Sequence, residues 1–144
     1  MPRIESRIDT HGAEFSARRA RMLALVDELR ALEARTREAS AGAAPLFERR
    51  GQLLPRERVA RLLDPGSPWL ELSTMAGYLL DDADPSRSVP GAGVICGIGF
   101  VAGARCLVSA SDSGIDAGAI QSMGREKMLR AQQLALENRL PFVQ

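Results

Sequence analysis

The sequence contains very little lysine, histidine, cysteine and aromatic side chain. Lys127 is its only lysine, so arginine supplies 18 of the 19 basic residues, and aromatic residues make up 4% of the chain. A hydrophobic core must therefore be built from Leu, Val, Ile, Ala and Met. No apolar run approaches the roughly 20 residues that span a bilayer, and no charged-then-apolar leader opens the chain. We therefore expect a cytoplasmic protein without a membrane partner.

Charge and metal-ligand patterns exclude further classes. A net charge of +1 gives no electrostatic reason to expect a nucleic-acid partner. The single histidine, His11, lies in a polar segment without other ligands at metal-binding spacing, so we expect no metal in this chain. Cys96 and Cys106 lie in neighbouring apolar segments. Two buried thiols in a reducing compartment is one interpretation, and a disulfide is the other.

The N-terminal third of the chain predicts an arm and a long helix, which we assign to residues 1–45. Residues 1–13 are polar and carry no period, whereas residues 14–39 place apolar side chains on one stripe, from Phe15 to Leu32. A helix of that length is about 39 Å long, which is too long for a small domain to cover. Part of the stripe should meet another subunit or a further domain. A dimeric coiled coil is the alternative, but the heptads are few.

Residues 46–144 predict a mixed α/β domain. Pro55 suits the first turn of a short helix over 53–64, in which Val59, Leu62 and Leu63 should face inward. Two apolar runs, 93–100 and 104–110, predict a hairpin whose strands are buried on both faces. The remaining expected elements are a linker (40–45), a short helix (46–52), a strand (69–73), a second helix (120–138) and a strand beginning at 142–143.

The junction between the hairpin and the second helix is the first candidate site. Residues 111–119 are mostly small, so backbone N–H groups near a helix start carry little side-chain cover. Such groups can hold a carbonyl oxygen that gains negative charge in an enolate or tetrahedral intermediate, and Gly118 and Ala119 are the candidate donors. The alternative is that Gly114 and Gly118 only permit a tight turn.

Basic side chains offer a second kind of site. Arg56 and Arg58 lie in the short helix, and Lys127 and Arg130 lie in the second helix. Each is a candidate for contact with the phosphate groups of a ligand. Solvated surface charge is the alternative explanation for each of them.

A series of motifs occurs in order along the chain. The motifs are QLLPRERV (52–59), LLDPGS (62–67), LEL (70–72), VICGIG (94–99) with Val101, Cys106 and Asp112, LRAQ (129–132) and ENRLP (137–141). Together they resemble the opening of the carboxyltransferase (beta) subunits of biotin-dependent acyl-CoA carboxylases. The methylcrotonyl-CoA and geranyl-CoA carboxylase beta subunits are the most similar, and residues 15–30 also resemble their N-terminal helix.

This resemblance implies a fold and an activity. Such subunits have two crotonase-like domains and transfer a carboxyl group from carboxybiotin to an acyl-CoA, whose thioester enolate is held by backbone N–H groups. The N-terminal domain binds the acyl-CoA, and the C-terminal domain of a second copy of the beta subunit brings the biotin. The resemblance also implies a biotin carboxylase or biotin carrier subunit as a partner. By this resemblance the chain is a partial crotonase-like (ClpP/crotonase) α/β domain preceded by a helical arm, with biotin carried by a partner.

The chain also departs from the family pattern. Many relatives carry Asn-Asp-Ala-Thr-Val-Lys-Gly-Gly-Thr over residues 111–119, where this chain has Asp116 for the lysine and Ala117-Gly118 for the glycine pair. The family's Leu-Val-Asp/Glu-Ser segment, expected directly after Gln144, is absent. We therefore expect the isolated chain to be inactive, and the identity of its acyl-CoA stays open. The alternatives are a non-catalytic assembly module and a crotonase-family hydratase or isomerase fragment.

Overall fold

The computed structural model describes residues 6, 8–80 and 82–144. The predicted N-terminal arm therefore lies partly outside the described residues, as does residue 81 of the acidic loop. Contacts divide the chain into two units, Met1–Ala31 and Leu32–Gln144, and we treat each by itself. The boundary between these units falls within a helix. The domain boundary that the sequence suggested after residue 45 stays a prediction.

The long helix is confirmed as α1 (Ala13–Ala41). Within the first unit several of its large apolar residues are exposed: Met22 is 61% exposed and Leu25 is 52% exposed. Within the second unit its last turns are different, because Thr36 and Ser40 are buried. None of the helices in the described ranges has both the length and the apolarity of a membrane span.

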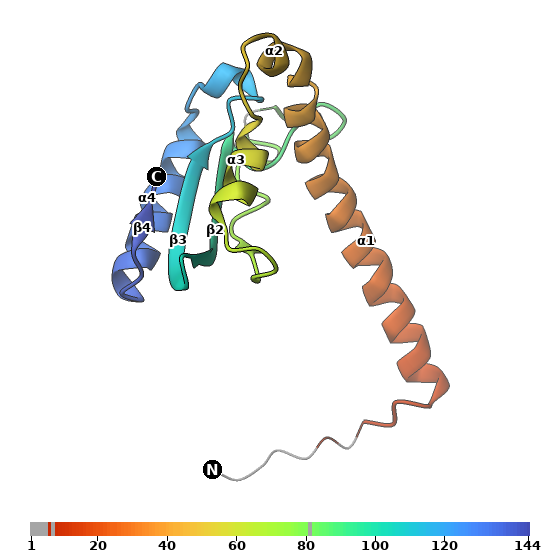
Figure 1. The fold of residues 1–144 in the computed structure, drawn as a ribbon. Coiled ribbons are helices and arrows are strands. Elements are labelled where there is room, and N and C mark those ends of the chain that lie inside the picture. Colours follow the sequence, from red (N-terminus) through yellow and green to blue (C-terminus); the bar gives the residue numbers. More distant parts are fainter. Residues whose placement is uncertain (1–5, 7, 81) are drawn as a thin grey trace. The chain divides into compact units, whose positions relative to one another are not determined.

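The second unit is built on a four-stranded sheet in the order β1-β2-β3-β4. β1 (Leu70–Glu71), β2 (Val94–Val101) and β3 (Ala104–Ser111) pair antiparallel, and β4 (Phe142–Val143) pairs parallel to β3. The β2–β3 hairpin, labelled in Figure 1, confirms the pairing that the two apolar runs predicted. Its turn residues Ala102 and Gly103 both have positive φ, and both donate N–H groups to the Asp64 carboxylate.

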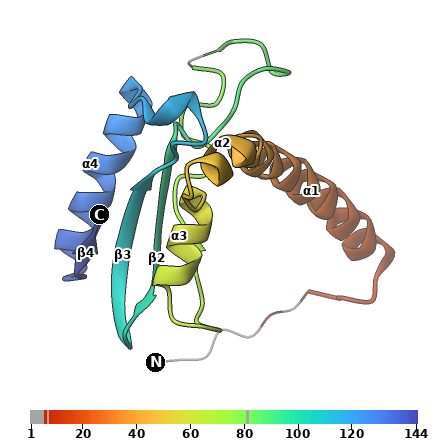
Figure 2. The same ribbon diagram turned by 45° about the horizontal axis from the view of Figure 1, so that its top comes forward.

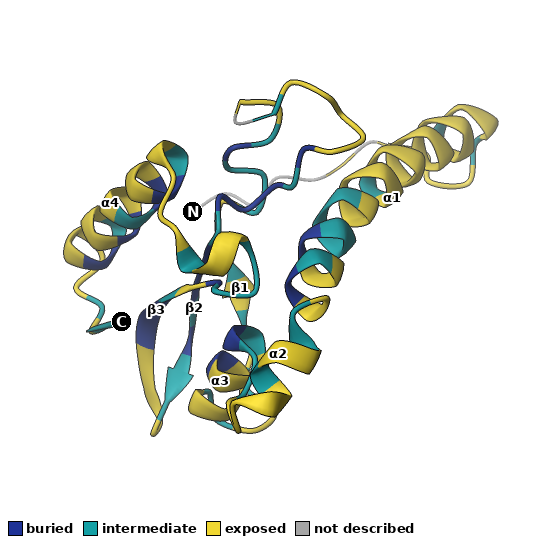
Figure 3. Ribbon diagram, turned by 90° about the horizontal axis from the view of Figure 1, so that it is seen from above, coloured by how far each residue is buried: buried dark blue, intermediate teal, exposed yellow. Residues whose placement is uncertain are grey.

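Both faces of the hairpin are covered, as its continuous apolar runs predicted. One face packs on α4 (Ser122–Glu137), and the other on α3 (Pro55–Leu62), so the two helices lie on opposite sides of the sheet in Figure 2. Figure 3 shows buried residues along both strands and on the side of α4 that faces them. Cys96 belongs to the first cluster and Cys106 to the second, which explains why both thiols are free.

Two local expectations are wrong. Leu62 is 39% exposed and lines a cavity instead of facing inward, whereas Val59 and Leu63 pack in the hydrophobic cluster on the sheet. The predicted linker at 40–45 is mostly helical, because α1 continues to Ala41 and α2 (Ala44–Arg49) follows after two residues. Small residues predicted a linker here, but burial of Ser40 favours two more helical residues.

Candidate functional site

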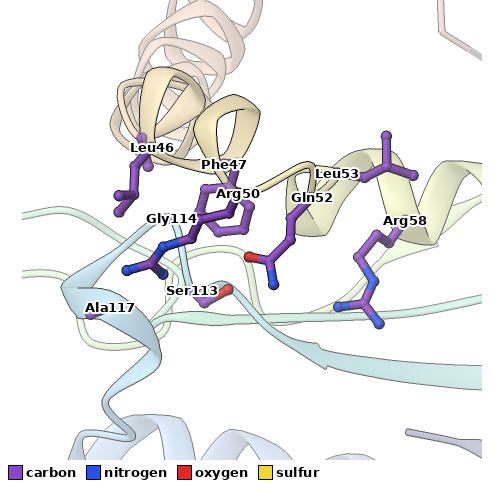
Figure 4. A pocket seen from close by; sticks show the side chains of 10 residues that line it. Leu46, Phe47, Arg50, Gln52, Leu53, Arg58, Ser113, Gly114 and Ala117 are labelled. Carbon is purple, nitrogen blue, oxygen red and sulfur yellow. The ribbon is translucent and has the colours of Figure 1, made fainter.

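The largest concave feature next to the predicted junction is a cavity of about 630 Å³ between α2, the start of α3 and the loop after β3. Figure 4 shows Leu46 and Phe47 on one side and Ser113 and Gly114 opposite, with the Arg50 side chain between them and Arg58 at the other end of the cavity, beyond Gln52. The full lining is Ala43, Leu46, Phe47, Arg50, Gln52, Leu53, Arg58, Ser113, Gly114 and Ala117. The cavity therefore combines an apolar wall with two guanidinium groups.

A second cavity of about 590 Å³ adjoins the first and shares Arg58 and Ser113 with it. This second cavity runs along α3 and the C-terminal half of β3 toward Val143 and Gln144. Arg58 therefore lies at the junction of two concave surfaces. An elongated ligand that follows both would pass this guanidinium group.

The loop that forms one wall has an unusual backbone. Asp116, Ala117 and Gly118 all have positive φ, at 47°, 53° and 84°, and they form the 3-10 turn η1 (Asp116–Gly118). The left-handed region costs a non-glycine residue about 1–2 kcal/mol. Ala117 stands where the family pattern has glycine, so the turn keeps the backbone shape that the glycine would adopt freely. Strain of this kind persists only where the surroundings hold the loop in place.

The predicted oxyanion donors are paired within this turn. The Gly118 N–H donates to the Ile115 carbonyl oxygen and the Ala119 N–H to that of Asp116, each at 3.0 Å. A role in holding a thioester oxygen stays a prediction, and it requires these amides to exchange or share their acceptors. By contrast, among the described residues the backbone N–H groups of Ser113 and Gly114 have no acceptor, and both residues line the cavity.

A buried carboxylate fixes the start of the loop. Asp112 is 1% exposed, and its Oδ1 accepts a hydrogen bond of 2.6 Å from the Ser40 hydroxyl in the last turn of α1. The backbone of Asp112 is also held, because its N–H donates to Gly93 and its carbonyl accepts from Ile115. The loop therefore leaves the sheet from an anchored residue.

Arg56, a predicted phosphate ligand, is engaged elsewhere. Its guanidinium makes two hydrogen bonds to the Glu71 carboxylate, at 3.0 and 2.9 Å. Its Nε lies 3.7 Å from Oδ2 of Asp112, and in the described part of the chain neither atom has a hydrogen-bond partner. The geometry shows an internal ion pair that ties α3 to β1, and the phosphate contact of Arg56 stays a prediction.

Lys127 is also an internal residue. It is 5% exposed, and its Nζ donates to the carbonyl oxygens of Val94 at 2.6 Å and Gly91 at 3.3 Å. Burial lowers the pKa of Lys127 below its ordinary value, and burial raises the pKa of the neighbouring Cys96 thiol. A phosphate contact by Lys127 stays a prediction, and it requires the ammonium group to leave these carbonyls.

Of the four predicted cations, Arg58 alone lines the two cavities. Arg130 lies on α4, outside both linings, with its guanidinium 3.8 Å from the Glu137 carboxylate. Sequence reasoning missed Phe47 and Arg50 of the lining, because the weak helical pattern over residues 46–52 carried no functional motif. Gln52 opens the motif at 52–59, but no binding role was assigned to it. In the described ranges, no group of three or more His, Cys, Asp or Glu is placed to hold a metal ion.

Comparison with known proteins places this geometry in a family. Residues 48–144 match the carboxyl transferase domain. A curated relative from Mycobacterium tuberculosis, the biotin-dependent 3-methylcrotonyl-coenzyme A carboxylase beta1 subunit, is 50% identical over 95 residues, which cover 65% of this chain and 17% of the relative. A probable mitochondrial methylcrotonoyl-CoA carboxylase beta chain from Drosophila melanogaster is 38% identical over 143 residues, covering 97% of this chain and 24% of the relative.

Solved structures show the same relationship. The beta subunit of geranyl-CoA carboxylase from P. aeruginosa superposes with a TM-score of 0.87 at 52% sequence identity, covering 98% of this chain and 26% of that one. The expected α/β, crotonase-like fold of the carboxyltransferases is thereby confirmed. The chain spans about a quarter or less of the length of these relatives.

Proposed function

The chain belongs to the carboxyl transferase domain family, and from that premise we propose that it forms the N-terminal part of a carboxyltransferase subunit of an acyl-CoA carboxylase. Within that subunit, it supplies one wall of the acyl-CoA site. Relatives that are named as carboxylase beta subunits support the proposal. Cytoplasmic location is part of the same proposal, although several relatives are named as mitochondrial.

The observation that carries the proposal is the composition of the cavity between α2 and the loop after β3. A coenzyme A thioester has anionic phosphates at one end and an apolar acyl group with a carbonyl at the other. The cavity offers guanidinium groups of Arg50 and Arg58 and apolar contacts from Leu46 and Phe47. It also offers the loop amides at 113 and 114, which have no acceptor among the described residues. Charge-assisted bonds to phosphate and N–H donors for a carbonyl oxygen are the chemistry that such a ligand requires.

The work of this chain in the reaction is binding and orientation. Arg58 and Arg50 hold the phosphates, and the loop from Ser113 to Ala119 presents N–H groups to the thioester oxygen as it gains charge. Biotin, carried by a partner subunit or domain, supplies the carboxyl group that is transferred. On this proposal, the isolated chain binds acyl-CoA without turning it over.

Titration calorimetry of the 144-residue chain with 3-methylcrotonyl-CoA tests this function. Binding should weaken about tenfold in Arg58→Gln, because a charged hydrogen bond to phosphate contributes about 1.5–3 kcal/mol in a partly shielded site. Arg61→Gln is the matched control, since Arg61 lies on the same helix outside both linings. Equal effects of the two substitutions would contradict the site, and turnover with free biotin would contradict the division of labour.

A non-catalytic assembly module is the second candidate. The observation in its favour is the row of open apolar residues on α1 in the first unit, including Met22, Leu25 and Leu29. Such a helix suits contact with another copy of the beta subunit or with a biotin carboxylase subunit. Capture of a purified biotin carboxylase subunit together with no detectable acyl-CoA binding would favour the module over the binding wall.

A further inference from the structure

The last turn of α1 is tied to the loop of the candidate site by one buried side-chain bond. The Ser40 hydroxyl donates to Oδ1 of Asp112 at 2.6 Å, across 72 positions of sequence. Ser40 is 2% exposed and Asp112 is 1% exposed, so water does not compete for either group. A hydrogen bond to a buried carboxylate is among the stronger kinds in proteins.

The contact is also steric. A Cβ on Gly114 would lie 2.6 Å from the Ser40 carbonyl oxygen and 3.0 Å from the Ser40 Cα. The backbone of α1 therefore lies directly against the backbone of the loop, with room only for glycine. The two residues that flank Ser113 thus contact one residue of the helix, and Ser113 lines the cavity.

The carboxylate depends on Ser40 more than on its other neighbours. Oδ2 of Asp112 has no hydrogen-bond partner among the described residues, and Arg56 Nε stands 3.7 Å away while its guanidinium binds Glu71. Within the described part of the chain, Ser40 is thus the side chain that donates a hydrogen bond to this carboxylate. A buried carboxylate that loses its donor is strongly disfavoured, so the loop would move to find another.

We propose that Ser40 is a positioning residue: through Asp112, it sets the place of the loop Ser113–Ala119 and so of the backbone donors in the cavity. Ser40 itself lines neither of the two cavities, so it acts through Asp112 and Gly114. The left-handed turn η1 begins two residues after Gly114. Because strained backbone persists only where its surroundings hold it in place, this turn needs a fixed anchor such as the contact with Ser40. The relevance to acyl-CoA rests on the proposed function, whereas the order of the loop does not.

Hydrogen exchange measured by NMR on the full chain tests the inference without any ligand. Ser40→Ala removes the donor and should raise exchange of the Gly118 and Ala119 amides, relative to Leu107 in β3, by about tenfold or more. Thr36→Val is the matched control, since the Thr36 hydroxyl makes a buried bond of 2.8 Å to Pro90 one turn earlier on α1. There the change relative to Leu107 should stay below about twofold.

Calorimetry with 3-methylcrotonyl-CoA provides the second measurement. Affinity should fall about tenfold in Ser40→Ala and stay unchanged in Thr36→Val, a difference that lost stability alone does not produce. Should Ser40→Ala fail to fold, Ser40→Cys keeps the shape with a weaker donor and should give intermediate exchange. Unchanged loop exchange in folded Ser40→Ala, or equal loosening by Thr36→Val, would overturn the positioning role. If the wild-type chain binds no acyl-CoA while Ser40→Ala still loosens the loop, the proposed function fails and the positioning role stands.

Discussion

Replacement of Gly114 by alanine probes the contact between α1 and the loop most directly. The φ angle of Gly114 lies outside the left-handed region, so alanine suits the backbone conformation. The added Cβ would nevertheless lie 2.6 Å from the Ser40 carbonyl oxygen, 2.7 Å from its hydroxyl and 3.0 Å from its Cα. Two of these three atoms are backbone and cannot rotate away, so either the helix end or the loop must shift.

The expected cost follows from that geometry. Overpacking of a well-packed contact costs about 1–3 kcal/mol, and a clash with backbone belongs at the upper end, so we expect about 2–3 kcal/mol. Urea unfolding of the 144-residue chain measures this loss as a lower midpoint at unchanged slope. Exchange of the Ala119 amide should rise in the same variant, because the loop carries the displacement.

Gly51→Ala is the control that separates clash from backbone strain. Gly51 has a φ of 64°, and a Cβ added there would meet no atom within 4 Å, so alanine costs only the left-handed conformation, about 1 kcal/mol. The reasoning is refuted if Gly114→Ala is as stable as the wild type. It is also refuted if Gly114→Ala loses no more stability than Gly51→Ala, because the close approach to Ser40 would then carry no cost.

Three further predictions concern the residues around the site. Burial lowers the pKa of Lys127, so between that lowered pKa and about pH 10.4 the unfolded chain binds more protons than the folded chain. Across this window the stability of the wild type should rise with pH relative to that of Lys127→Met. Urea unfolding at several pH values measures the sign of this change. Ala117→Gly relieves about 1–2 kcal/mol of backbone strain and adds about 0.5–1 kcal/mol of backbone entropy cost, so the unfolding free energy should rise by up to about 1.5 kcal/mol. A clear loss of stability would contradict the strained turn. Gly97→Ala would place a Cβ 2.4 Å from the ring of Trp69, the single tryptophan, and should lower the free energy of unfolding by about 3 kcal/mol. The fluorescence of Trp69 should then report unfolding at a lower urea concentration than in the wild type.

Sequence patterns predicted the elements whose causes are local. The period of α1, Pro55 at the start of α3 and the two apolar runs of the hairpin each specify their structure within a few residues. The exposed position of Leu62 was not predictable. The periodicity of α3 shows which of its residues are apolar, but it does not show how much of the helix surface the sheet covers. The extra turn at Ser40 also has a distant cause, its bond to Asp112.

The candidate site shows the same difference between features with local causes and features with distant causes. The small-residue junction after β3 was visible in the sequence, and it does form one wall of the cavity. The roles of individual cations were not visible, because a side-chain charge shows nothing of its partner: Arg56 binds Glu71 and Lys127 binds two carbonyls. Arg50 escaped notice for the converse reason, since only the fold brings α2 to the loop.

The position of Lys127 has a practical consequence. A protease that cleaves only after lysine has a single target bond in this sequence, between Lys127 and Met128, within α4. That bond belongs to a helix packed on the sheet, and the amine beside it is covered. The rate at which the folded chain is cut into two pieces therefore measures the local opening of α4 from the sheet.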